Sequence, residues 1–139
     1  MIHIVYWSGT GNTEKMAEAI AEGARSCGAE VSLADVRLAD DGILDGDVIL
    51  FGCPAMGAEQ LEESEFEPFF SSLEERLSGK KIGLFGSYDW GDGEWMRLWT
   101  ERAQSAGAVL IAEGLTAHNA PDEEALAACR ALGETAARR

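Results

Sequence analysis

The sequence is poor in basic residues. Its 139 residues include 11 Lys and Arg against 25 Asp and Glu, which gives a formal net charge of -14 at pH 7. This charge repels nucleic acids and anionic membrane surfaces at long range, so we expect neither as a partner. It also repels further copies of the chain, so we expect a monomer. The composition leaves open whether the charge only keeps the protein in solution or also steers basic partners toward it.

Cysteine, histidine and long apolar runs are scarce as well. Cys27, Cys53 and Cys129 show no CxxC spacing, so the sequence predicts neither a disulfide framework nor a zinc site and favours a reducing cytoplasm. His3 and His118 stand apart from carboxylate or cysteine clusters, and we expect no metal site. No apolar run approaches about 18 residues, and the N-terminal MIHIVYW has no basic region. We therefore expect no membrane segment and no secretory leader.

Three short apolar runs predict buried strands of a parallel sheet. They span residues 2–7, 48–51 and 82–85, and each is closed by glycine or serine. Runs that are apolar on both faces are typical of strands covered by helices on both sides. Residues 30–36 alternate more strictly, and the run that begins at Val109 becomes polar early, so these two segments fit the edges of the sheet.

Four other segments place apolar residues at helical spacing, and each stripe can cover a face of the sheet. The stripes are Met16, Ile20, Ala24 and Cys27; Phe66, Phe69, Phe70, Leu73 and Leu77; Trp95, Leu98, Trp99, Ala103 and Ala106; and Leu126, Cys129, Leu132 and Ala136. The segment LADDGILDG, residues 38–46, is short and rich in glycine, and it predicts a turn or one helical turn.

Strands that alternate with helices predict an α/β fold, with a parallel sheet and helices on both faces. The length fits one domain over residues 1–139, and an apolar fraction of 46% is enough for a core. In such sheets, ligands bind beyond the carboxyl ends of the strands, where the strand order reverses. The loops after the first, third and fourth strands are therefore expected to carry the chemistry.

The first loop, SGTGNT, joins a strand to a helix, so its backbone N–H groups and the helix N-terminus favour an anion. Neutral hydroxyl and amide donors, with two glycines that allow close approach, fit a phosphate monoester. These residues are Ser8, Gly9, Thr10, Gly11, Asn12 and Thr13. The loop is neither a Walker loop nor a GxGxxG fingerprint, which argues against nucleoside triphosphates and NAD. The alternative is a plain turn with a Ser/Thr helix cap.

The second loop (residues 53–60) and the third loop (residues 87–95) supply flat and apolar side chains. Trp90, between Asp89 and glycine, is the ring that we expect to face a ligand, whereas Trp95 begins a helical stripe and fits the core. Met56 is a soft apolar partner for the other face of a planar ring. Met56 and Trp90 could instead simply pack together. A planar redox-active ring on a phosphate tail, without an adenylate site, describes flavin mononucleotide (FMN).

Three separate stretches of the sequence resemble the flavodoxins, specifically the short-chain, clostridial-type branch. They are SGTGNTEKMA, GCPAMGAEQLEESEFEPFF and GKKIGLFGSYDWGDGEWM, which match in order and spacing over nearly all of the chain. The last strand, from Val109 onward, has no long insertion, and in this respect the chain resembles the short-chain branch. The resemblance implies a flavodoxin-like three-layer sandwich with a five-stranded parallel sheet in the order 2-1-3-4-5. It also implies a low-potential carrier of single electrons with a non-covalently bound FMN and no substrate turnover of its own.

The resemblance also implies a role for individual residues. Residues 8–13 would bind the FMN phosphate with help from Ser87. Met56 and Trp90 would lie on opposite faces of the isoalloxazine, the Gly57 carbonyl would turn toward N5 on one-electron reduction, and Glu59 would contact N3. The full expected set adds Pro54, Ala55, Tyr88 and the backbone N–H groups of Asp89 and Gly91, which would reach the pyrimidine oxygen. Ala58 and Asp89 depart from the family pattern, which bears on the tuning of the potential.

Carboxylates beside the second loop form a candidate docking face for basic redox proteins. They are Glu59, Glu62, Glu63, Glu65 and Glu67. A solvated acidic helix start is the alternative, because acidic residues are favoured there.

Three other functions fit the sequence less well. A phosphatase needs an arginine six residues after Cys53, where Glu59 stands; a quinone reductase needs open space over the ring; and a receiver domain needs an acidic pair where Trp7 and Ser8 stand.

Overall fold

The structure is a computed structural model that describes residues 1–57 and 59–139. Over these residues the chain forms one parallel sheet in the strand order β2-β1-β3-β4-β5, and β6 also pairs with β4. The strands are β1 (Ile2–Tyr6), β2 (Val31–Asp35), β3 (Val48–Gly52), β4 (Lys81–Tyr88), β5 (Val109–Leu110) and β6 (Leu115–His118). The expected parallel sheet and its order 2-1-3-4-5 are therefore confirmed.

Burial along the strands explains their order. All five residues of β3 are buried, whereas β2 is half-buried along its whole length. A central strand is covered on both faces, so an uninterrupted apolar run favours it, while an alternating run suits an edge. The edge position predicted for residues 30–36 is thus confirmed.

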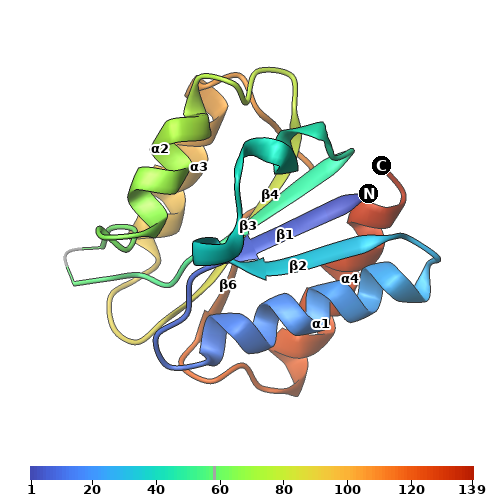
Figure 1. Cartoon of the computed structure of the whole chain (residues 1–139). Coiled ribbons are helices and arrows are strands. Elements are labelled where there is room, and N and C mark those ends of the chain that lie inside the picture. Colours follow the sequence, from blue (N-terminus) through green and yellow to red (C-terminus); the bar gives the residue numbers. More distant parts are fainter. Residues whose placement is uncertain (58) are drawn as a thin grey trace.

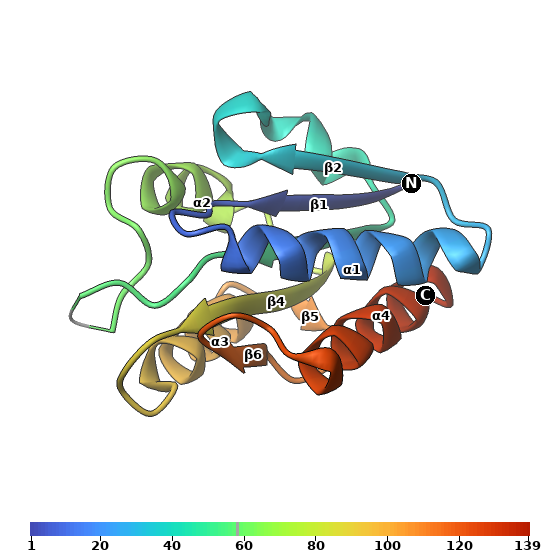
Figure 2. The same cartoon turned by 90° about the horizontal axis from the view of Figure 1, so that it is seen from below.

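Two pairs of helices sandwich the sheet (Figures 1 and 2). Helices α1 (Asn12–Ser26) and α4 (Glu123–Ala137) cover one face, and α2 (Phe66–Glu74) and α3 (Glu94–Ser105) cover the other. The helical stripes of the sequence supply the two cores, such as Met16 and Ile20 on one side and Phe66 and Phe70 on the other. Helices α1 and α4 are in close contact. A Cβ on Gly133 of α4 would collide with the backbone of Ile20 in α1, so the contact requires glycine.

The segment between β2 and β3 forms two 3₁₀ turns, η1 (Val36–Leu38) and η2 (Asp41–Asp45). The carboxylates of Asp35 and Asp40 cap them by accepting bonds from Arg37 N and Gly42 N, at 2.9 and 2.8 Å. These turns agree with the short helical turn predicted for residues 38–46.

The last strand differs from the single run expected from Val109. It is split into β5 and β6, which both pair with β4 on either side of residues 111–114. The break falls where the sequence turns to Ala-Glu-Gly, and a Cβ on Gly114 would meet the Met96 side chain of α3. Pairing therefore stops where the backbone lies against α3 and resumes at Leu115, so that β6 ends beside the end of β4. Among the described residues, no helix is long and apolar enough to cross a membrane.

Candidate functional site

The carboxyl ends of the strands meet at one edge of the sheet, and the three expected loops meet there (Figure 2). They enclose a cavity of about 260 Å³. Its lining consists of Trp7, Gly9, Thr10, Asn12, Pro54, Ala55, Met56, Ser87, Tyr88, Asp89 and Asn119. Among these lining residues there is no lysine or arginine. The structure therefore brings together one neutral polar wall and one apolar, aromatic wall.

The first loop presents an open helix N-terminus to this cavity. Gly11 has φ +93° and is the N-cap residue of α1, so the N-cap position itself has no side chain that could cap the helix. Ser8 Oγ instead accepts bonds from Gly11 N at 3.0 Å and Glu14 N at 3.3 Å, which shapes the loop. Because the hydroxyl oxygen accepts in both bonds, its own proton stays available as a donor. The partial positive charge of the helix end favours an anion here without a basic side chain. The hydroxyls of Ser8 and Thr10 thus accept from two N–H groups at the start of α1, as in the alternative of a Ser/Thr-capped turn, and the end of the helix keeps its positive partial charge.

Thr13 and Ser87 join the first loop to the end of β4. Their hydroxyls lie 2.9 Å apart, and both residues are buried. Ser87 lines the cavity, whereas the Thr13 side chain is fully buried behind it. Thr13 therefore orients Ser87 rather than standing at the cavity surface itself.

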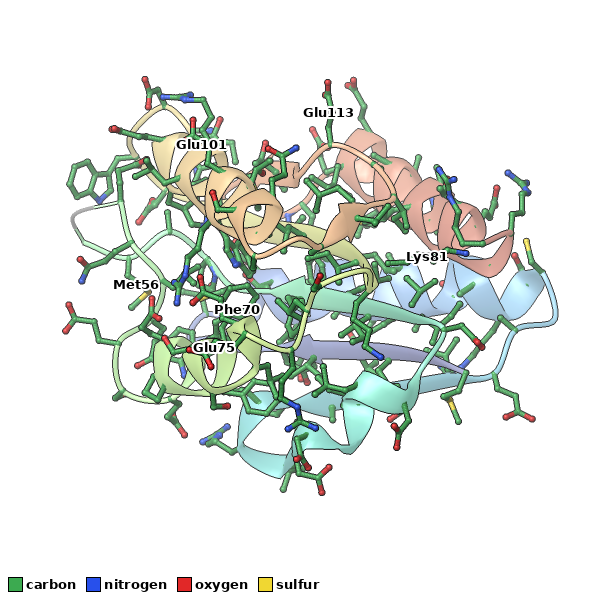
Figure 3. The ribbon with its side chains drawn as sticks, turned by 90° about the horizontal axis from the view of Figure 1, so that it is seen from above. Met56, Phe70, Glu75, Lys81, Glu101 and Glu113 are labelled. Atoms are coloured by element: carbon green, nitrogen blue, oxygen red, sulfur yellow. The ribbon has the colours of Figure 1, made fainter. Side chains whose placement is uncertain are left out.

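The second loop, which follows β3, turns back on itself. Met56 and Gln60 exchange two backbone bonds, at 2.9 and 3.2 Å, which close a tight turn. Within it Gly57 has φ +23° and Glu59 has φ +57°. Met56 lines the cavity, and Figure 3 shows it at the loop end of the molecule, far from Lys81 at the start of β4. Ala58, one of the two departures noted in the sequence, lies outside the described residues.

Glu59 links the second loop to the third. Its carboxylate accepts a bond from Trp95 N, at the start of α3, at 2.9 Å. A Cβ on Gly91 would collide with the same carboxylate, so glycine is needed there for close approach. Glu59 also shares a cluster with Asp92 and Glu94, in which the carboxylate oxygens lie within 4.8 Å of one another. This edge of the site is therefore strongly negative.

Cys53 is inert in this setting. Burial raises the pKa of its thiol to about 12, so the thiol stays protonated at neutral pH. Its carbonyl accepts a bond from the indole Nε1 of Trp95 at 3.2 Å, and a Cβ on Gly86 would collide with that carbonyl. Cys53 therefore belongs to the packing beneath the site, and a thiolate phosphatase is not supported.

The third loop separates its two tryptophans as the sequence predicts. Trp95 is 1% exposed and part of the core, whereas Trp90 is 69% exposed. Such exposure argues against the alternative in which Trp90 and Met56 only pack together. Tyr88 packs between Trp95, at 5.6 Å between ring centroids, and His118, at 5.0 Å. Trp90 and Gly91 are not among the residues that line the cavity.

The five carboxylates of the candidate docking face differ in what they contact. Glu62 is 6% exposed and accepts bonds from the backbone N–H groups of Ser64, Glu65 and Phe66 at 2.8 to 2.9 Å. Burial alone would raise the pKa of Glu62, but these bonds and one from the Ser64 hydroxyl outweigh it and lower the pKa. Glu62 therefore caps the start of α2 instead of facing solvent.

Two further carboxylates of the candidate docking face, those of Glu65 and Glu67, bond to side chains of other segments. Glu67 binds the guanidinium of Arg102 at 2.6 and 2.7 Å, which lowers the pKa of Glu67. Glu65 accepts a bond from the Trp7 indole at 3.2 Å. Among the described residues, Glu63 is exposed and accepts a bond from Gln60 of its own loop.

Sequence reasoning did not predict a role at the site for Trp7, His118 or Asn119. Trp7 and Asn119 line the cavity, and His118 bonds to the Asp89 carbonyl at 2.8 Å. Asn119 has φ +59°, in the left-handed region where asparagine is favoured. The available signal was HNAP, a turn-type sequence directly after the last strand. The rule that selects loops at the carboxyl edge applies to that strand as well.

The fold and this edge define a doubly wound α/β protein that binds a ligand with a phosphate end and a planar ring. The family model described as Flavodoxin matches residues 4–133. The chain is 49% identical to the flavodoxin of Megasphaera elsdenii over 99% of both chains. It is 53% identical to that of Clostridium beijerinckii over 86% of this chain and 88% of the other. The solution structure of two-electron reduced Megasphaera elsdenii flavodoxin has a TM-score of 0.89, at 49% identity, and covers both chains completely.

The chain belongs to the flavodoxin family. Flavodoxins are FMN-binding electron carriers, so this protein transfers electrons between redox partners on a non-covalently bound FMN. The described residues fit that group. A helix N-terminus surrounded by neutral hydroxyls suits a phosphate, and the apolar and aromatic residues beside it, with an exposed indole in the third loop, suit a flat ring.

Proposed function

We propose that this flavodoxin transfers one electron at a time at low potential and converts no substrate of its own. The observation that carries the proposal is the cavity at the carboxyl edge, where neutral donors and aromatic side chains meet without a lysine or arginine in the lining. FMN supplies the redox chemistry when it is bound, and the protein supplies orientation and electrostatics.

The first loop would hold the phosphate end of FMN. Backbone N–H groups at the start of α1 point the positive end of the helix at the anion, and the hydroxyls of Ser8 and Thr10 add donors. Ser87, held by the buried Thr13, would add a donor from β4. The proposed phosphate set is Ser8, Gly9, Thr10, Gly11, Asn12 and Ser87, and Thr13 would contribute by orienting Ser87.

The second and third loops would hold the ring. Met56 and Trp90 would contact its two faces, and the Gly57 carbonyl would turn toward the ring on reduction, because glycine tolerates backbone conformations that a side chain would penalise. The proposed ring set is Pro54, Ala55, Met56, Gly57, Glu59, Tyr88, Asp89, Trp90 and Gly91. Trp90 and Met56 would also obstruct a second substrate over the ring, in keeping with a carrier rather than a quinone reductase.

The charges around the site would make the second electron harder to add. Glu59, Asp92 and Glu94 form a carboxylate cluster beside the third loop, and Asp89 is exposed in the loop itself. In the described structure the basic side chain that reaches this loop is Arg97, which pairs with Asp92 at 3.3 Å. Fixed negative charge disfavours a further negative charge on the reduced ring, so the second reduction step should lie at low potential.

Basic redox proteins would dock at the acidic face beside the second loop. Of its five carboxylates, Glu63 is exposed and free of basic partners in the described structure, while Glu62 and Glu67 are committed to α2 and Arg102. Docking would therefore depend on Glu63 and the exposed Asp89 more than on the buried members of the face. The exposed ring of Trp90 in the third loop would give the face an apolar contact.

The remaining parts of the proposal concern the whole chain. Residues 1–139 would act as one FMN-binding domain, since both cores pack on the same sheet. A monomer is favoured by the net charge of -14. A reducing cytoplasm suits Cys27, Cys53 and Cys129, which are free thiols.

Two measurements test the proposal. Titration of the apoprotein with FMN should quench tryptophan fluorescence at one FMN per chain, and Trp90→Ala should lose most of that quenching. Leu98→Ala, which removes an exposed apolar side chain of α3 outside the third loop, is the matched control and should keep the quenching. The FMN-loaded protein should show no turnover with NAD(P)H and quinone. Equal quenching in Trp90→Ala would remove Trp90 from the site, and steady turnover would make the protein an enzyme.

A further inference from the structure

Side chains from outside the third loop hold it on both sides of Trp90 and Gly91. His118, at the end of β6, bonds to the Asp89 carbonyl at 2.8 Å. Arg97, in α3, donates to the Asp92 carbonyl at 3.2 Å and pairs with the Asp92 carboxylate at 3.3 Å. Trp90 and Gly91 lie between these two anchors. The exposed Trp90 indole therefore belongs to a short loop segment whose two ends, Asp89 and Asp92, are held by hydrogen bonds.

The anchor at His118 is itself well supported. Tyr88 and His118 are paired in the ladder between β4 and β6, and Asn119 N donates to the Tyr88 carbonyl at 2.7 Å. The imidazole packs against the Tyr88 ring, whose centroid is 5.0 Å away, and Tyr88 in turn packs against the buried Trp95. These contacts fix the direction in which the imidazole Nε2 points.

We propose that His118 is a positioning residue for the FMN ring. A carbonyl oxygen can only accept, so the imidazole Nε2–H is the donor, and both the neutral Nε2–H tautomer and the cation provide it. Because the peptide unit is planar, fixing the Asp89 carbonyl also fixes the N–H of Trp90, which points the opposite way. His118 thereby sets the orientation of the Asp89–Trp90 peptide. This inference rests on the proposed function, in which Asp89, Trp90 and Gly91 hold the ring.

The two sides of the ring site would then differ in mobility. On one side Gly57 is exposed, and a glycine would tolerate reorientation of its peptide. On the other side the Asp89–Trp90 peptide is locked by β6, a strand far away in the sequence. His118 would keep one wall fixed while the other adjusts to the charge on the ring.

The test compares three variants in FMN affinity and in the two one-electron midpoint potentials. His118→Ala removes the donor and should weaken FMN binding about 3- to 10-fold, the loss expected for one hydrogen bond. It should also shift the midpoint of the second step. His118→Gln keeps an N–H donor and should stay within about twofold of the unmodified protein. Thr116→Ala, at another exposed position of β6, is the matched control and should change neither quantity.

A control ligand separates positioning from general damage. Inorganic phosphate probes the first loop alone, so its affinity for the His118→Ala apoprotein should be unchanged. Wild-type affinity and midpoints in His118→Ala would overturn the inference, and so would equal losses in His118→Ala and His118→Gln or a parallel loss of phosphate affinity. Failure of the unmodified protein to bind FMN is a separate result, which would overturn the proposed function and this inference with it.

Discussion

At the scale of single residues, small differences in chemistry separate side chains that look alike in the sequence. Trp90 and Trp95 lie five positions apart, yet one is exposed beside the site and the other is buried. The sequence predicts this difference, because Trp95 starts a helical stripe and Trp90 sits among turn residues. The roles of Glu62 and Glu63 could not be predicted, because only the path of the chain decides which carboxylate meets the N-terminus of α2.

Asp89 gives a first prediction. If its carboxylate lies about 7 Å from the reduced ring, Coulomb's law gives about 0.6 kcal/mol in water and about 2.4 kcal/mol at a dielectric constant of 20, or about 25 to 100 mV. Asp89 is exposed, so solvent should hold the effect near the lower end. Asp89→Asn should therefore raise the midpoint of the second step by tens of millivolts, and by less at high salt.

The control for Asp89 is Asp45→Asn, which removes an exposed carboxylate in η2, just before β3 at the opposite edge of the sheet. Redox titration at two salt concentrations compares the variants. A midpoint that stays constant or falls in Asp89→Asn would show that this carboxylate does not tune the flavin.

Gly57 gives a second prediction. A threonine at φ +23° is strained by its backbone, although there is space for its Cβ, so reorientation of this peptide should become less favourable. Gly57→Thr should bring the midpoints of the two one-electron steps closer together. Gly79→Thr is a matched control, since Gly79 has φ +77° and equally open space but lies between α2 and β4, away from the site. An unchanged separation in Gly57→Thr would rule out a role for this peptide in redox tuning.

At the scale of elements, most of the architecture could be predicted. The central strands are apolar on both faces and the helices carry regular stripes, so local pattern and tertiary position agree. The break in the last strand could not be predicted, because it depends on how Gly114 meets Met96 of α3. The same break places β6, and with it His118 and Asn119, beside the third loop.

Helix α2 gives a third prediction, because its start depends on the Glu62 carboxylate. The pKa of Glu62 is lowered in the folded protein, so its contribution to stability is complete above the ordinary value of 4.5 and is lost as pH falls through the lower folded value. Glu62→Gln should reduce the free energy of unfolding by about 2 kcal/mol at pH 7. The difference should shrink in acid, where the native carboxyl is also neutral.

Urea unfolding at a series of pH values measures this effect, with Glu63→Gln as the control for an exposed neighbour. The control should change stability by less than about 0.5 kcal/mol. A constant difference between Glu62→Gln and the unmodified protein across the pH range would contradict the capping role.

At the scale of the whole molecule, charge is distributed unevenly around the site. The acidic groups of the second and third loops lie at the carboxyl edge, while Lys80 and Lys81 lie at the start of β4, where they bond to the carbonyls of Leu44 and Arg139. Figure 3 shows Lys81 at the end of the molecule opposite Met56. A basic partner approaching from solution would therefore be attracted toward the loops rather than the far edge.

This distribution gives a fourth prediction. Electron transfer from the reduced protein to a basic c-type cytochrome should slow several-fold as ionic strength rises from about 0.01 to 0.15 M, because screening shortens the reach of the charges. Glu63→Gln should slow the reaction at low salt. Glu113→Gln changes an exposed carboxylate distant from Met56 in Figure 3 and should have a smaller effect. Equal effects of the two variants in stopped-flow measurements would remove Glu63 from the docking face.

Stepwise reduction of the FMN-loaded protein, followed by its visible spectrum, tests the central claim most directly. The carboxylates beside the third loop and the glycine at position 57 predict two separate one-electron midpoints, with the second at lower potential. The spectrum should therefore pass through a distinct form at half reduction, at one FMN per chain. A single two-electron transition without that form, or a purified protein that takes up no FMN, would contradict the account.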